Sequence, residues 1–301
     1  MLEPGVRPGR KPSNSRVSSP YTCFMANPAF SNSPAFSAKA AQRLAARDAA
    51  APPVPTPGQL QEHYSLPDAT PDQMERMTYQ DTIFKTLAGF AVLLVGAAIG
   101  WMIPALAIVG ALVGLVLALV NIFKRKPSPP LILAYAFFEG LLVGGVSYFF
   151  STMWNGIVPM ALLGTLGVVA VTLALFASGK VRASKRATKI FLVAIVGYAA
   201  FSLVNIVLMM TGVLDGFSAT GGLRGIEIPI FGGIPLGIPL GILVVLLAAY
   251  SLVLDFDNIK RGVESGAPRI YGWTGAFGIM VTVVWLYLEI LRLLSYFLPR
   301  N

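Results

Sequence analysis

Seven long apolar runs dominate the chain after residue 82. Each has about the 20 residues that a helix needs to cross a hydrocarbon core of about 30 Å. The first two are continuous, because Ile83–Phe123 carries only one charge, on Lys85, and a turn at Trp101–Pro104 is expected to divide it. The other runs lie at about 131–150, 157–178, 190–211, 235–257 and 273–298. The pattern predicts an all-α fold, a polytopic membrane protein whose residues 82–301 form a seven-transmembrane-helix bundle.

Residues 1–81 have a different pattern, with twelve of the twenty-two prolines and much Ala, Ser and Asn. We predict a disordered Pro/Ala/Ser-rich cytoplasmic tail. The alternative is a surface-lying or partner-binding helix over 38–51, which the following Pro-rich stretch would end. Met25 is a second candidate start, so residues 1–24 are interpreted as a mis-called start of the gene.

The composition agrees with a membrane domain and excludes several kinds of site. The chain is 55% hydrophobic and 12% charged, whereas an ordinary soluble domain is about 25% charged. Its single cysteine, Cys23, and single histidine, His63, exclude an internal disulfide and argue against zinc, haem and iron–sulfur sites. We expect no cofactor. The sequence also lacks a phosphate-binding glycine loop and a nucleophile elbow, so we predict that the protein is not an enzyme.

The net charge of +9 comes from basic residues between the apolar runs. Eleven Lys and Arg residues fall in three alternate loops, at 124–126, 180–189 and 260–269, and the other loops carry only Arg224. Because basic loops stay in the cytoplasm, we predict a cytoplasmic N-terminus and an outer C-terminus in the plasma (inner) membrane. The charge therefore reports topology, and we expect the lipid bilayer and not nucleic acid as a partner.

Small residues recur four positions apart within several runs. Such spacing lets helix backbones approach closely, so it predicts tight helix packing, with a hinge or pore-lining role as the alternative. The glycine pairs are 96/100, 110/114, 140/144 and 237/241. The Gly-rich loop at 212–234 is expected to be either a loose connector or a cover over an outer vestibule.

Four acids lie in or at the ends of the predicted spans, where a charge costs about 2.5–3.5 kcal/mol on insertion scales. Asp255 and Glu289 occupy consecutive spans, so we predict that they meet and share a proton. Alternatively, Arg292 neutralises Glu289 from three residues along the same helix. Asp257 is expected to be a solvated helix-end residue, and Glu139 either a hydrogen-bonded strut or part of an ion path.

Three segments, taken in order, resemble the Bax inhibitor-1/YccA family. LDFDNI at 254–259 resembles the end of its sixth span, and WLYLEILRLL at 285–294 its last span. FFEGLLVGG at 137–145 is similar to its third span, and MANPAFSNSPAF to the start of actinobacterial members. The resemblance implies a seven-helix bundle with the last helix near its centre and a pH-sensitive calcium leak.

In that family, two aspartates on the last two helices form a proton-sensing latch, and Asp255 and Glu289 match their positions. The chain departs from the family pattern in three ways. Glu289 is one methylene longer than the usual Asp, Arg292 replaces a neutral polar residue, and the loop between the helices is longer. The resemblance thus assigns proton sensing to Asp255 and Glu289. The further candidates for proton sensing or the ion pathway are Arg292, Glu139 and Asp257.

These observations leave two functions open. The first is a pH-sensitive passive cation leak, for which Ca²⁺ and protons are the expected ions and Asp255 and Glu289 weak Ca²⁺ ligands. The second is a non-transporting protein that modulates membrane proteases or stress and cell-death machinery through its tail and basic loops. An intramembrane aspartyl protease is disfavoured, because the Gly-x-Gly-Asp motif is absent and Pro104-Ala105-Leu106 precedes both acids.

Overall fold

The computed structural model describes residues 76–212, 222–228 and 233–299. Within these ranges, seven helices are long and apolar enough to cross a membrane, which confirms the predicted fold class. The helices are α5 Tyr79–Met102, α6 Leu106–Phe123, α7 Pro129–Met153, α8 Ile157–Ala177, α9 Lys185–Met210, α10 Gly237–Glu264 and α11 Gly272–Leu294. The predicted tail lies outside the described residues up to residue 75.

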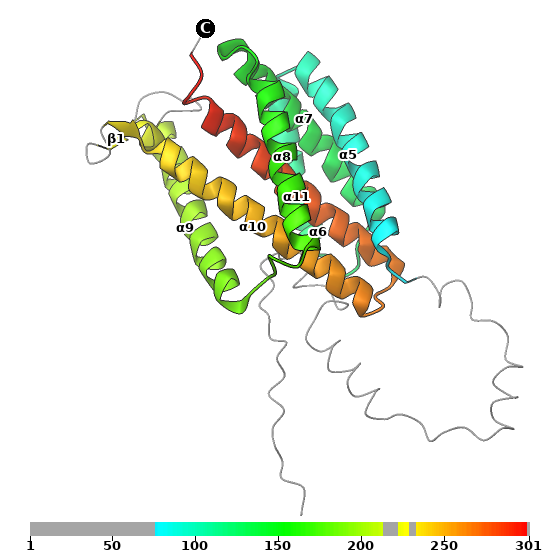
Figure 1. The fold of residues 1–301 in the computed structure, drawn as a ribbon. Helices are drawn as coiled ribbons and strands as arrows, with labels where there is room; N and C mark the ends of the chain where they lie inside the picture. Colours follow the sequence, from blue (N-terminus) through cyan, green and yellow to red (C-terminus); the bar gives the residue numbers. More distant parts are fainter. Residues whose placement is uncertain (1–75, 213–221, 229–232, 300–301) are drawn as a thin grey trace, which may run out of the picture.

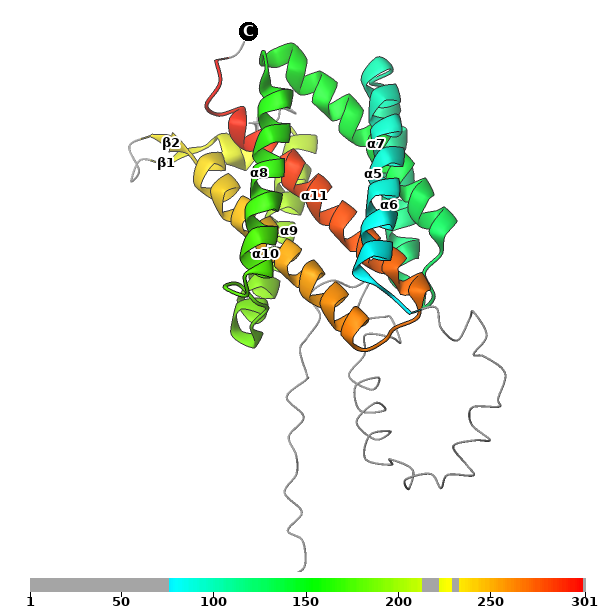
Figure 2. The same cartoon turned by 45° about the vertical axis from the view of Figure 1, so that its right-hand side comes forward.

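The last helix, α11, is the centre of the bundle. It contacts α5, α7, α8 and α10, and these neighbours surround it in both views (Figures 1 and 2). Buried residues make up 56% of its membrane-spanning window, the highest share among the seven helices. Its central position agrees with the expectation from the family resemblance.

Glycines hold α5 and α6 against α7, as the spacing of small residues predicted. Gly96 and Gly100 of α5 face the α7 backbone at Phe137 and Leu141, and Gly140 of α7 faces Leu93 of α5. A Cβ atom at these glycines would meet backbone atoms that cannot rotate away. Close backbone approach replaces the missing side chains, so van der Waals contact holds these three helices together.

The fifth helix, α9, lies at the edge of the bundle beside α10 (Figure 1). After α9, the described chain resumes with a short 3₁₀ helix, η1 Gly222–Gly225, which contacts α9 and α10. Two short strands, β1 Glu227–Ile228 and β2 Ile234–Pro235, pair antiparallel before α10 begins. The described part of the loop is therefore folded back onto the bundle.

The sixth helix is longer than the sequence predicted. We expected it to end near Asp257, but α10 continues to Glu264. Asp257 pairs with Arg261 one turn later, and Lys260 pairs with Glu264, so helical ion pairs satisfy the polar residues beyond the apolar run. Asp255 consequently lies nine residues inside the helix and not at its end.

The chain before α5 is attached to the loop between α10 and α11. The Met77 amide donates to the Ala267 carbonyl at 2.7 Å, and the backbone of Arg76 forms an isolated antiparallel β-bridge with Pro268. The buried Met77 side chain packs with Ile259 and Ala267. The segment that leads into α5 is thus fixed to the loop that joins α10 and α11.

Alanine at Gly140 tests the close packing of α5 and α7. We expect Gly140→Ala to lower the free energy of unfolding by about 1–3 kcal/mol, because the added methyl meets backbone. Gly167→Ala on the exposed face of α8 is the matched control, since nothing lies within 4 Å of its Cβ position. Thermal unfolding in detergent compares them, and equal midpoints would contradict this packing.

Candidate functional site

Glu289 is a buried carboxylate on α11, five residues before the helix ends, with 1% of its surface exposed. Its Oε1 accepts a hydrogen bond from Nη1 of Arg224 at 3.0 Å. Its Oε2 accepts from Nη1 of Arg292 at 2.8 Å and from the Tyr198 hydroxyl at 2.9 Å. Three charged or polar groups thus satisfy a charge that would otherwise be too costly in an apolar bundle.

Arg224 reaches this carboxylate from η1, a loop element, and is only 4% exposed. Its Nη2 also donates to the Tyr198 hydroxyl at 2.7 Å. The guanidinium lies 5.4 Å from the centre of the Tyr198 ring and 6.0 Å from that of Phe201. The loop therefore places a cation deep between α9 and α11, with aromatic rings around it.

One face of α9 holds this loop in place. Tyr198, Phe201 and Asn205 are three and four residues apart, so they lie along the same side of the helix. The Asn205 side-chain oxygen accepts from the Leu223 amide at 2.7 Å. Gly222 precedes that amide with a φ of 68°, and a Cβ there would collide with Asn205, so glycine is required.

The site carries more positive than negative charge. Arg224 and Arg292 share the single carboxylate of Glu289, and Arg292 is the more exposed of the two. Burial acts to lower the pKa of Arg224, but Glu289 and Tyr198 outweigh it, so the pKa of Arg224 lies above its usual range. Arg224 therefore keeps its positive charge beside the Glu289 carboxylate.

Tyr296, in the turn after α11, borders the same site. Its buried hydroxyl lies against Gly237 and has no hydrogen-bond partner among the described residues. Burial raises the pKa of Tyr296, with Arg224 and Arg292 acting in the opposite direction. The Tyr296 side chain therefore borders the site as an uncharged phenol.

Asp255 forms a second polar cluster, between α10 and α11, and is fully buried. Its Oδ2 accepts from the Thr282 hydroxyl at 2.7 Å, and that hydroxyl is 3.3 Å from the hydroxyl of Ser251. Ser251 is one turn before Asp255 on α10. A carboxylate and two hydroxyls thus line the contact between the last two helices.

The predicted direct pair of Asp255 and Glu289 does not form in this structure. Asp255 lies level with Thr282, and Glu289 is seven residues farther along α11, or about 10.5 Å at 1.5 Å per residue. The described partners of Glu289 are Arg224, Arg292 and Tyr198. The ion pair with Arg292, which was the alternative, is present.

The other two predicted residues lie outside both clusters. Asp257 is paired with Arg261 on α10, with Nε of Arg261 2.9 Å from Oδ2. Glu139 is half-buried on α7 and faces α6 at Gly114, where a Cβ would lie 3.2 Å from its Oε2. The structure therefore brings neither of them to Glu289 or Asp255.

Arg224 and Tyr198 belong to the site, although the sequence did not predict either of them as a site residue. The signal for Arg224 was present, because it is the only Lys or Arg in the loops at its end of the bundle. We interpreted it only as a topology marker. Tyr198 carries no such signal, since one tyrosine in an apolar run resembles an ordinary core residue.

Metal ligands are sparse across the described ranges. No group of three or more His, Cys, Asp or Glu side chains gathers there in a way that could hold a metal ion. Among the described residues, the Asp255 carboxylate is grouped with the hydroxyls of Thr282 and Ser251.

Residues 27–298 match the family model described as Bax inhibitor 1 like, which covers most of the sequence and all seven helices. The chain belongs to the Bax inhibitor 1 like family. A comparison with curated proteins gave no match. The family assignment confirms the resemblance seen in the sequence and, with the seven apolar helices, indicates a multi-pass membrane protein.

Removing the charge of Glu289 should destabilise the bundle more than removing that of Arg224. Glu289→Gln leaves Arg224 buried without an anion, for which we expect a loss of about 3–5 kcal/mol. Arg224→Gln leaves Glu289 with Arg292 and Tyr198, so its loss should be smaller. Unfolding in a denaturing detergent series measures both losses.

The matched control is Asp257→Asn, which breaks a more exposed pair with Arg261 and should cost about 0–1 kcal/mol. Equal losses for Glu289→Gln and Asp257→Asn would show that the buried cluster contributes no more than an exposed ion pair.

Proposed function

We propose that this Bax inhibitor 1 like protein is a pH-sensitive, passive cation leak in the cell membrane, with Ca²⁺ as the principal ion. We place the basic loops in the cytoplasm and the Glu289 cluster near the outer face. The observation that carries the proposal is a buried carboxylate whose countercharge, Arg224, comes from a loop. Because Arg224 lies on a loop, it can move away from Glu289. Arg292 lies on the same helix as Glu289 and stays beside it.

In the closed state, Glu289 is ionised and holds Arg224 inside the bundle. The two arginines then place a net positive charge at the outer end of the helix pair, which repels a divalent cation. Asp255, with Thr282 and Ser251, lies deeper and is kept from ions arriving from that side. Closure is thus an electrostatic barrier supported by a packed loop.

Acidification opens the leak in this scheme. A proton on Glu289 removes the anion between Arg224 and Arg292, and the two cations then repel each other. A buried guanidinium without an anion is costly, so the η1 loop moves out toward water. A cation that enters next meets the oxygens of Asp255, Thr282 and Ser251, which are hard ligands suited to Ca²⁺.

The groups facing Glu289 determine the direction of the pH response. Arg224 from η1, Arg292 from α11, Tyr198 from α9 and Tyr296 after α11 surround it. Arginine side chains stay charged at physiological pH values, and we assign the proton that opens the leak to Glu289. The leak should therefore be low while Glu289 is ionised and rise as the pH falls.

Flux across proteoliposomes loaded with a calcium dye tests the gate. Glu289→Gln should raise the Ca²⁺ leak at neutral pH about tenfold, if the open state is populated to about 10% or less beforehand. Its flux should also lose its pH dependence. The control is Glu227→Gln, which removes an exposed carboxylate from the same loop region and should leave the flux profile unchanged. A Glu289→Gln profile identical to that of the parent would refute the gate.

Asp255 is proposed as the ion-contacting carboxylate, so its role differs from that of Glu289. Asp255→Asn should reduce the acid-stimulated Ca²⁺ leak severalfold while the pH of half-maximal flux stays the same. Asp257→Asn, two residues along α10, removes an acid that pairs with Arg261 and should have little effect. Loss of flux in both variants, or in neither, would contradict this assignment. The interaction-protein alternative stays a prediction, because its main surface lies outside the described residues.

A further inference from the structure

Five basic side chains gather where α8 ends and α9 begins, at the end of the bundle that carries the basic loops (the basic end). All five are exposed, and we call residues 180–189 the basic turn. The five are Lys180, Arg182, Lys185, Arg186 and Lys189. The sequence has no Asp or Glu between Glu139 and Asp215, so no acid close along the chain neutralises them. None of the five forms an ion pair with an acid among residues 76–212, 222–228 and 233–299.

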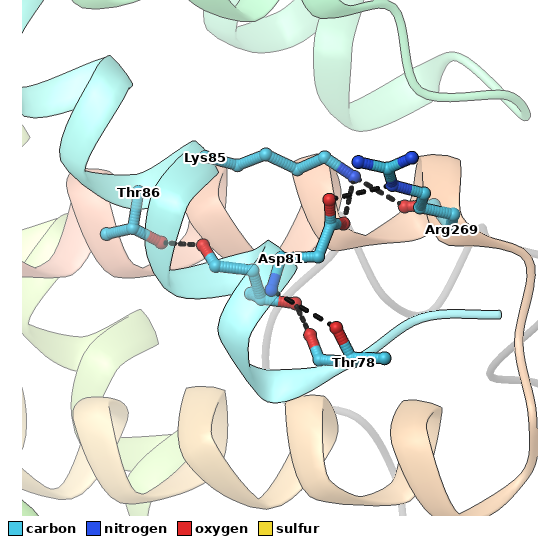
Figure 3. A network of polar contacts seen from close by, with 6 residues as sticks. Thr78, Asp81, Lys85, Thr86 and Arg269 are labelled. Atoms are coloured by element: carbon cyan, nitrogen blue, oxygen red, sulfur yellow. Dashed lines mark hydrogen bonds and ion pairs between the residues drawn. The ribbon is translucent and has the colours of Figure 1, made fainter. Parts of the chain in front are cut away.

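Other cations at the basic end do have acidic partners. Lys85 and Arg269 both pair with the Asp81 carboxylate at the start of α5 (Figure 3). Arg261 pairs with Asp257 one turn earlier on α10. The basic turn differs from these two places because its positive charges have no carboxylate beside them in the described structure.

The first turns of α9 place cations where the helix itself disfavours them. The Ser184 side chain caps the helix by accepting from the Ala187 amide, and Lys185 and Arg186 follow directly. The N-terminal end of a helix carries a partial positive charge, so cations there are unfavourable. Lys185 and Lys189 are four residues apart, a spacing at which like charges repel each other. An anion bound from outside would relieve both effects.

The cations of α9 lie on the same face as exposed apolar side chains. At 3.6 residues per turn, Lys185, Arg186 and Lys189 lie within about 100° of one another around the helix. Val193 and Val196 continue the same face and are 75% and 67% exposed. Any occupant of this face would contact charge at the start of the helix and hydrocarbon beyond it.

The opposite face of α9 is fixed to α10. The Thr188 side chain is buried, and its hydroxyl lies 3.1 Å from the hydroxyl of Tyr250. Phe191, one turn later, is buried in a cluster with Leu247 and Leu254 of α10. Because these contacts set the rotation of α9 about its axis, its cations and exposed valines point away from the bundle.

We propose that the basic turn binds the headgroup of an anionic phospholipid, with one acyl chain along the exposed face of α9. The negative phosphodiester complements the uncompensated cations. An inorganic anion would match the charge but would leave the apolar strip beyond Lys189 unused. The topology requires cations only somewhere in this loop, whereas lipid binding also accounts for their position on the outward face of α9. The inference does not depend on the proposed leak, because it concerns which lipid binds and not which ion passes.

Native mass spectrometry of the full chain, released from detergent with added lipid, tests the site. We expect the first phosphatidylglycerol to bind about tenfold more tightly than the first phosphatidylcholine, because cations near the membrane surface attract anionic lipid. The double variant Arg186→Gln and Lys189→Gln should reduce this preference to about twofold. An equal affinity for the two lipids in the parent chain, or an unchanged preference in the double variant, would overturn the proposal.

The matched control is the double variant Lys260→Gln and Arg261→Gln. It removes two charges from the same end of the bundle, but these cations pair with Glu264 and Asp257. The control should keep the full preference for phosphatidylglycerol. An equal loss in both double variants would show a response to total charge and would contradict a site at the basic turn.

Soluble competitors separate a lipid site from a site for free anions. Neither inorganic phosphate nor glycerophosphoglycerol, the headgroup without acyl chains, should displace phosphatidylglycerol from the parent chain at equal concentration. Displacement by either compound would show that the apolar face of α9 adds nothing, and the lipid proposal would then be wrong.

If the double variant does not fold, a fluorescent label near the site replaces it. The label is attached at Val193→Cys in a chain with Cys23→Ser, reconstituted in phosphatidylcholine vesicles with brominated lipid. Brominated phosphatidylglycerol should quench this label at an about fivefold lower fraction than brominated phosphatidylcholine. A label at Leu163→Cys, an exposed position in the other half of α8, should be quenched equally by both lipids. Equal quenching of the Val193 label by both lipids would refute the site.

Discussion

The buried ion pair between Glu289 and Arg224 is the interaction on which the outer half of this bundle depends. A carboxylate on the central helix cannot remain ionised in an apolar surrounding without a partner. Its own helix supplies Arg292, yet Arg292 is partly exposed, and the loop supplies the fully buried partner. The loop is held to α9 through Asn205 and Gly222. The charge of Glu289 therefore holds α11, the η1 loop and α9 together.

The position of α11 explains why such a charge has wide consequences. It packs against α5, α7, α8 and α10 and is hydrogen-bonded to α9 through Glu289 and Tyr198, so a change at Glu289 is transmitted to a helix that the rest of the bundle surrounds. Asp255, two turns away, connects the same helix to α10 through Thr282. At the basic end, the chain before α5 is hydrogen-bonded to the α10–α11 loop through Met77, and Asp81 of α5 pairs with Arg269. The two ends of the bundle are therefore held by separate sets of contacts.

The sequence was sufficient for the spans and for the close helix contacts, because length, hydropathy and glycine spacing are local signals. The end of α10 was predicted too early, since ion pairs extend that helix beyond its apolar run. The Asp255–Glu289 pair was predicted from the adjacency of the spans and from the family resemblance, and neither gives the level of each residue along the helix axis in this chain. Arg224 stood out in the sequence as a lone basic residue, but its partner could not be assigned, because its position depends on how a loop folds back onto α9.

The central claim is that loss of the Glu289 charge releases the loop that carries Arg224. The distance between two spin labels, measured by electron paramagnetic resonance, tests it most directly. Labels on Ile226 and Phe297, both exposed, are introduced into a chain with Cys23→Ser and reconstituted in bilayers. We expect a single short distance at neutral pH that shifts to longer values on acidification, and the long distance already at neutral pH in Glu289→Gln. One unchanged distance distribution at every pH and in both chains would contradict the account.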